Sequence, residues 1–231
     1  MKKFLFFIFI VLPILSCGYE VYYESSSSSS WQSSSSELGG NFSSSSSHSD
    51  VIFGTSVDYY DETYETVVIG TQTWFKRNLS YNPNTGTSAC YNNEESNCST
   101  YGRLYDWSTA MGLASSCNST SCSGQVSAKH RGICPSGWHI PSNEDWDKLM
   151  RYVDGSTGTS SPYNSPTAGR YLKAASGWNS YSGIVNLDSY GFSALPGGYG
   201  AYSRYMRYDN EGAYWSDNDK SDLSSIRCIQ D

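Results

Sequence analysis

Six of the seven cysteines in this chain lie beyond residue 50, and their pairing restricts the fold more than any other feature of the sequence. An even set of cysteines in an exported chain indicates disulfides, although six cysteines permit 15 pairings. Nearness in sequence favours the pairs Cys90–Cys98 and Cys117–Cys122, which leaves Cys134–Cys228 to close a long loop. In the chain-entropy model a loop of that length contributes about 4–5 kcal/mol. A metal site is the weaker interpretation, because no Cys-x-x-Cys motif occurs.

The N-terminus predicts export. Two lysines precede an apolar run over residues 4–12, which is too short to span a membrane and is typical of a signal peptide. The following residues 14–17 resemble a bacterial lipobox, in which the cysteine is acylated and the chain is cut before it. We therefore expect residues 1–16 to be removed and Cys17 to anchor the protein to the outer membrane, at the cell surface. The alternative is an ordinary signal peptide with Cys17 unmodified.

A serine-rich segment follows, and residues 17–50 predict a lipidated N-terminus with a flexible linker. Such a segment buries too little apolar surface to offset the entropy of ordering it. Residues 51–231 then have the length of one domain with a real core. A formal net charge of −7 and the absence of a lysine or arginine cluster argue against nucleic acid as a partner.

One stretch of this domain, residues 134–150, combines a strand signal around Trp138 with a helix start. Ser142 precedes Asp145 by three residues, which predicts a capping box. Apolar residues then recur at three- and four-residue spacing and predict one buried helix face. They are Trp146, Leu149, Met150 and Val153.

The remaining elements predict an α+β domain that is rich in loops and tied by disulfides. Residues 66–69 and 73–75 favour a hairpin of β-branched and aromatic residues. Residues 101–112 predict a first helix, so that the helix after Ser142 is the second. Residues 213–216 and 224–229 predict closing strands. We therefore expect two helices with a small, mostly antiparallel sheet.

Several motifs in this order resemble the Fibrobacter succinogenes major paralogous domain, over about residues 67–231. They are IGTQTW at 69–74, YGRLY at 101–105, CPSGWHIPS at 134–142, GFSALPGG at 191–198, YWS at 214–216 and RC at 227–228. The resemblance implies a domain of bacterial surface lipoproteins, often preceded by a low-complexity linker. It also implies a C-type-lectin-like fold, which formylglycine-generating enzymes share. It implies no biochemical activity.

Catalysis has little support in the sequence. Only three histidines are present, and no zinc-protease, nucleophile-elbow or phosphate-loop motif occurs. A formylglycine-generating enzyme needs reactive cysteines, whereas Cys228 is expected in a structural bridge. The carboxylates Glu144, Asp145 and Asp147 fall at the start of a helix, where the helix dipole explains them. We therefore expect no catalytic residues.

A calcium site is one candidate for binding. The segment Trp215 to Asp219 is similar to the Trp-Asn-Asp calcium-ligand run of C-type lectins, but it inserts Ser216 and lacks a nearby Glu-Pro-Asn partner. Asp217, Asn218 and Asp219 offer the hard oxygen ligands that calcium prefers. The alternative is a solvated polar turn, because these residue types are also common in turns.

An aromatic surface is the other candidate. Tyrosines recur every three residues from Tyr199 to Tyr208, in a region rich in glycine, so several rings can be exposed. Exposed rings beside arginines suit contacts with sugars or proteins. The candidate ligand-binding residues are Trp178, Tyr199, Tyr202, Arg204, Tyr205 and Trp215. The alternative is ordinary packing of these rings.

These observations together predict a noncatalytic surface module that binds a polysaccharide or a protein partner. No cofactor is expected with certainty, although calcium is a candidate. A structural or envelope-coating protein without a discrete ligand is the alternative. An enzyme of the formylglycine-generating type ranks third.

Overall fold

The computed structural model of the chain describes residues 50–197, 203–217 and 219–231. The expected signal peptide, Cys17 and almost all of the serine-rich linker lie outside these residues, as do Tyr199, Tyr202 and Asn218. No helix in the described ranges has the length and apolar character needed to cross a membrane.

The largest sheet has five strands in the order β1-β4-β5-β12-β8, and every neighbouring pair is antiparallel. Its strands are β1 (Ile52–Phe53), β4 (Thr66–Ile69), β5 (Gln72–Phe75), β12 (Ile229–Gln230) and β8 (Trp138–His139). The β4–β5 hairpin confirms the one predicted from the β-branched and aromatic residues. Gly70 in its turn has φ 63°, a backbone conformation that glycine adopts without steric cost.

A second sheet has three antiparallel strands in the order β11-β7-β6. They are β6 (Ser88–Cys90), β7 (Arg103–Tyr105) and β11 (Ser224–Ser225). Two further antiparallel pairs complete the strands: β2 (Val57–Tyr59) with β3 (Glu62–Tyr64), and β9 (Ser203–Met206) with β10 (Ala213–Ser216). The predicted closing strand at 213–216 is confirmed, whereas 224–229 divides between two different sheets.

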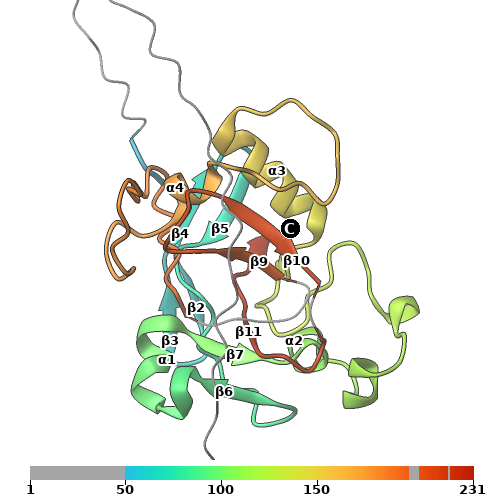
Figure 1. The fold of residues 1–231 in the computed structure, drawn as a ribbon. Helices are drawn as coiled ribbons and strands as arrows, with labels where there is room; N and C mark the ends of the chain where they lie inside the picture. The colour runs from blue at the N-terminus through green and yellow to red at the C-terminus, as the bar shows by residue number, and fades with distance from the viewer. Residues whose placement is uncertain (1–49, 198–202, 218) are drawn as a thin grey trace, which may run out of the picture. The chain divides into compact units, whose positions relative to one another are not determined.

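The described residues form four α-helices, where two were expected. They are α1 (Glu95–Tyr101), α2 (Trp107–Met111), α3 (Asn143–Asp154) and α4 (Ala168–Leu172), with short 3-10 turns at 91–93, 115–118 and 123–125. Figure 1 shows α3 and α4 beside the β4–β5 hairpin at one end of the domain, and α1, α2, β6 and β7 at the other. The α+β class is confirmed, and the number of helices was wrong.

The single helix predicted over residues 101–112 is the main error. Gly102, with φ 77° and ψ 179°, ends α1, and residues 103–105 then form a strand. Leu104 pairs there with Ala89 on one side and Ser225 on the other. The apolar spacing had a helical period, but strand pairing with a distant segment outweighs that local preference.

By contrast, α3 agrees with its prediction. The hydroxyl of Ser142 accepts a hydrogen bond from the backbone N–H of Asp145, whose carboxylate accepts one from the backbone N–H of Ser142. Leu149, Met150 and Val153 are buried, and Trp146 packs against the same core.

Two clusters of buried residues form the core. The first includes Trp74, Leu149, Met150, Phe192 and Ile229, and the second includes Tyr64, Phe75, Tyr105, Trp138 and Cys228. Neighbouring residues of β5 therefore serve different clusters, because successive side chains of a strand point to opposite faces.

All three expected disulfides are present: Cys90–Cys98, Cys117–Cys122 and Cys134–Cys228, with Cα–Cα distances of 5.0, 5.5 and 5.9 Å. The third joins two fully buried cysteines 94 residues apart. It ties the end of the chain to the segment that precedes α3. The loop that Cys90–Cys98 closes contains the first turn of α1.

Candidate functional site

A cleft of about 760 Å³ lies in the described part of the domain. Segments from both core clusters line it: the start of α2, the segment that enters α3, the turn before residue 198, strand β9 and the segment after β11. The lining includes residues with aromatic rings or hydrogen-bonding side chains, among them Asn78, Trp107, His130, Asn143, Trp146, Trp178, Arg204, Tyr205, Arg207, Asp222 and Arg227.

Three partly buried tryptophans line the cleft from different elements. Trp107 begins α2, and the ammonium of Lys220 lies 4.0 Å from the centre of its ring. Trp146 on α3 packs on Trp74, with ring centres 4.9 Å apart. Trp178 donates its indole N–H to the carbonyl of Ala194 at 2.8 Å. Contacts of this kind fix the orientation of each ring, so the cleft has rigid aromatic walls.

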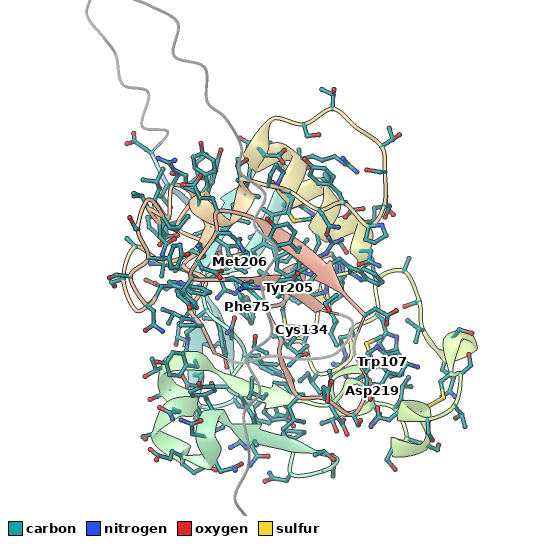
Figure 2. The ribbon with its side chains drawn as sticks, viewed as in Figure 1. Phe75, Trp107, Cys134, Tyr205, Met206 and Asp219 are labelled. Atoms are coloured by element: carbon teal, nitrogen blue, oxygen red, sulfur yellow. A yellow bond between two sulfur atoms is a disulfide. The ribbon has the colours of Figure 1, made fainter. Side chains whose placement is uncertain are left out.

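Strand β9 contributes Arg204 and Tyr205 to the same cleft. Figure 2 shows Tyr205 and Met206 next to each other on this strand, with Trp107 and Asp219 together at another place in the view. The ring of Tyr205 packs on that of Tyr214 across the β9–β10 pair, with centres 5.6 Å apart. Tyr205 is half-buried, which leaves part of its ring for a ligand.

The side chain of Arg204 is buried. Its guanidinium donates to the carboxylate of Asp147 at 2.5 Å, and the two side chains are only 2% and 8% exposed. It also donates to the carbonyl of Tyr163 at 2.5 Å. Burial lowers the pKa of Arg204, and the charge of Asp147 offsets part of that effect. The main contacts of Arg204 therefore stabilise the wall of the cleft.

Arg227 is the second buried arginine of the cleft, and its surroundings are different. Its Nε and Nη2 donate to Oδ1 of Asn78 at 3.1 and 2.9 Å, and its Nη1 donates to the carbonyl of Phe192. The guanidinium carbon lies 4.3 Å from the centre of the Phe192 ring. Burial lowers the pKa of Arg227 to about 9, against an opposing effect from the charge of Asp188. The group is therefore a cation at neutral pH, held by neutral oxygens.

The structure brings together three of the six predicted ligand-binding residues. Trp178, Arg204 and Tyr205 line the cleft. Trp215 lies on β10 and is not among the lining residues; its backbone N–H donates to the side chain of Asn164 at 2.7 Å. The other two predicted residues, Tyr199 and Tyr202, lie outside the described residues.

The predicted calcium ligands Asp217 and Asp219 are exposed. Within the described ranges, neither belongs to a group of three histidine, cysteine or acidic residues close enough to share an ion. The one such group is Cys90, Glu95 and Cys98, whose sulfurs form a disulfide and so offer no thiolate. Lys220 follows Asp219, and its backbone carbonyl accepts a hydrogen bond from the backbone N–H of Trp107 at 2.8 Å. The segment around Asp219 therefore lies at one wall of the cleft. Calcium binding stays a prediction.

The sequence did not identify Asn78, Trp107, Asp147 or Arg227 as site residues. The available signal was weak: Arg227 is an ionisable residue between the apolar Ile226 and the buried Cys228, within a short stretch that otherwise predicts a strand. Asp147 was explained by the helix dipole, but its carboxylate binds Arg204 and the backbone N–H of Tyr163.

Comparison with known proteins identifies a family. The model of the Fibrobacter succinogenes major domain matches residues 67–230, which is well over half of the chain. No curated protein and no solved structure matches. The C-type-lectin-like fold therefore stays a prediction, and no activity is transferred from a relative. The matched range includes every described residue that lines the cleft, and the chain belongs to the Fibrobacter succinogenes major domain family.

Proposed function

We propose that this protein is a noncatalytic surface lipoprotein whose folded domain binds a carbohydrate in the cleft. The observation that carries the proposal is the combination of rigid rings with hydrogen-bonding side chains around one concavity. Trp107, Trp178 and Tyr205 offer apolar faces, while Asn143 offers an amide and Ser127 offers a hydroxyl. Sugars have apolar C–H faces and polar edges, so a cleft with both kinds of group suits them.

Binding is favoured over catalysis by the state of the reactive groups. All six cysteines of the described residues are in disulfides, so the described part offers no thiol for chemistry of the formylglycine-generating type. The ring nitrogen Nε2 of His130, a histidine that lines the cleft, lies 2.8 Å from the carbonyl oxygen of Met111, so this hydrogen bond holds the ring. These contacts support a rigid binding surface.

The proposal includes anchoring through Cys17 and presentation on a serine-rich tether. Its support is the lipobox-like sequence and the family match, which suggests a surface-associated domain. Mass spectrometry of the intact protein from membranes tests this part. A mature chain that begins at Cys17 and carries acyl groups is expected, and a chain that retains residues before Cys17 would contradict it.

Retention on glycans tests the binding function. The expected mature chain, residues 17–231 with Cys17→Ser, would be applied to cellulose, xylan and a glycan array, with and without a chelator. We expect retention on at least one glycan, with at least tenfold weaker binding for Trp107→Ala. The matched control is Trp215→Ala, which removes a partly buried tryptophan that does not line the cleft.

Other outcomes separate the alternatives. Loss of retention with the chelator would implicate Asp217 and Asp219 in calcium-dependent binding. Equal binding by the two tryptophan variants would place the glycan outside the cleft. No retention on any glycan would refute the proposal and favour a structural role or a protein partner.

A further inference from the structure

We propose that the ligand of the cleft is an acidic glycan, and that Arg227 binds the carboxylate of one of its sugar residues. This inference rests on the proposed function, because it specifies the class of carbohydrate that the same cleft accepts. Four observations support it: the charged residues of the lining, the missing counter-ion of Arg227, the unused N–H groups of its guanidinium and the aromatic rings around it.

Arginines outnumber acidic residues in the lining of the cleft, although the whole chain is acidic. The whole sequence has 22 acidic and 15 basic residues, with a formal net charge of −7. Apart from tyrosines, the ionisable residues that line the cleft are nevertheless three arginines, one histidine and one aspartate: Arg204, Arg207, Arg227, His130 and Asp222. Asp147 and Asp209 neutralise Arg204 and Arg207, which leaves Arg227 as the lining arginine whose charge can attract an anionic ligand.

Two of the three arginines already have a carboxylate. Arg204 is paired with Asp147 at 2.5 Å, and Arg207 is paired with Asp209 at 2.5 Å. Arg227 forms no ion pair with any carboxylate of the described residues; its partners are an amide oxygen and a backbone carbonyl. A buried guanidinium without a counter-ion is costly to maintain, so a binding role explains why this position carries a charge.

The guanidinium of Arg227 also has N–H groups that the protein does not use. An arginine side chain carries five N–H groups, and the protein uses three of them here, one each on Nε, Nη1 and Nη2. One N–H on each Nη nitrogen is therefore left without a partner among the described residues. A carboxylate accepts two such hydrogen bonds at once, which makes it the anion best matched to the remaining donors.

The position of Arg227 favours a sugar acid over an acidic peptide. Arg227 is only 6% exposed yet lines the cleft, and Phe192, Trp146 and Trp178 line the same cavity. A uronic acid combines an apolar ring face with a carboxylate on the ring, so one residue can meet a tryptophan and the guanidinium together. Asn78 accepts two hydrogen bonds from Arg227 and keeps the guanidinium in place for that contact.

The test compares glycans that differ only in charge. Residues 17–231 with Cys17→Ser would be titrated calorimetrically with oligogalacturonate and with its methyl ester, and with xylo-oligosaccharides that carry or lack glucuronic acid. We expect at least tenfold tighter binding of the acidic member of one pair. Arg227→Met should abolish that preference, and Arg227→Lys, which keeps the charge but not the two-pronged donor, should reduce it.

A matched control and the contrary outcomes complete the experiment. Arg77→Met removes a partly exposed arginine that is paired with Glu62 and does not line the cleft, so it should keep the full preference. Equal binding of neutral and acidic glycans would refute this inference and leave the proposed function intact. Binding of acidic peptides but of no glycan would refute both, and so would no binding of any glycan.

Discussion

Arg204 and Arg227 line the same cleft with buried side chains, but the protein stabilises their charges in different ways. Arg204 has a carboxylate, Asp147, at 2.5 Å, whereas Arg227 has the amide oxygen of Asn78 and the carbonyl of Phe192. Burial lowers the pKa of both arginines; Asp147 opposes this at Arg204 through an ion pair, whereas Asp188 opposes it at Arg227 through its charge without forming an ion pair. Arg204 therefore has its counter-ion within the protein, although its Nε has no hydrogen-bond partner among the described residues, whereas the proposed counter-ion of Arg227 is a ligand.

The comparison teaches how to separate structural from functional charges. Removing one partner of a buried ion pair leaves the other charge uncompensated, which is strongly destabilising. Removing a buried charge that has no ionic partner leaves no charge behind, so the expected cost is small. Stability and binding should therefore respond in opposite ways at the two arginines.

The largest expected effect comes from the disulfide next to Arg227. Cys134→Ala with Cys228→Ala opens the 94-residue loop, and we expect a loss of about 4–5 kcal/mol in the free energy of unfolding, measured by urea denaturation. The matched control is the Cys117–Cys122 pair, whose five-residue loop should contribute only about 2 kcal/mol. Equal losses for the two pairs would contradict the loop argument.

Breaking the Arg204–Asp147 ion pair should have the next largest effect on the free energy of unfolding. Asp147→Asn leaves the guanidinium of Arg204 buried without a counter-ion, and we expect a loss of about 3–5 kcal/mol in the free energy of unfolding. Glu144→Gln is the control, because this acid lies exposed on the same helix and should change stability by less than about 0.5 kcal/mol. A loss below about 1 kcal/mol for Asp147→Asn would show that Arg204 does not depend on its carboxylate.

Asp106 has a buried carboxylate and resembles Arg227 in one respect: its hydrogen-bond partners are neutral. It caps α2 by accepting from the backbone N–H of Thr109 at 2.7 Å, and it accepts from Asn118 at 2.9 Å. Burial alone would raise the pKa of Asp106, but these hydrogen bonds outweigh burial and hold its pKa below the usual value. The folded state therefore binds this proton less readily than the unfolded state does.

The sign of the pH dependence follows directly. The stability that Asp106 contributes is present above the unfolded pKa of about 4 and is lost as the pH falls through the lower, folded pKa. At pH 7 we expect Asp106→Ala to cost about 1–2 kcal/mol, as for other helix caps. Urea denaturation at pH 7 and pH 3 should show a smaller cost at pH 3. An equal cost at both pH values would mean that the charge of Asp106 contributes nothing.

Local signals explain what the sequence could predict. The β4–β5 hairpin, the capping box of α3 and the disulfide pairs each depend on residues close together in sequence or on a small set of cysteines. Within the helix predicted over residues 101–112, α2 is helical but residues 103–105 were mispredicted, because the partners of β7 are not local: Leu104 pairs with Ser225, more than a hundred positions away.

The candidate site was predictable in part for the same reason. Trp178, Arg204 and Tyr205 were identified because aromatic and basic residues gather near them in the sequence. Arg227 was missed as a site residue because its hydrogen bonds reach Asn78, 149 positions earlier. A periodic sequence pattern gives no information on contacts between residues so far apart. The burial of the Arg227 charge can therefore be found only from the folded structure.

The smallest expected change in stability belongs to Arg227→Met, and it decides the comparison. Methionine has a similar volume and no charge, so the variant should unfold within about 1 kcal/mol of the original protein. Methionine removes the cost of burying an unpaired charge, and this offsets the hydrogen bond that the carbonyl of the buried Phe192 loses. Asn78 also loses its hydrogen bonds, but it is half-buried at the cleft and can bind water instead. Arg204→Met, which strands the carboxylate of Asp147, should cost at least about 3 kcal/mol. If Arg227→Met costs as much as Arg204→Met in urea denaturation, both arginines are structural, and the cleft holds no charge reserved for a ligand.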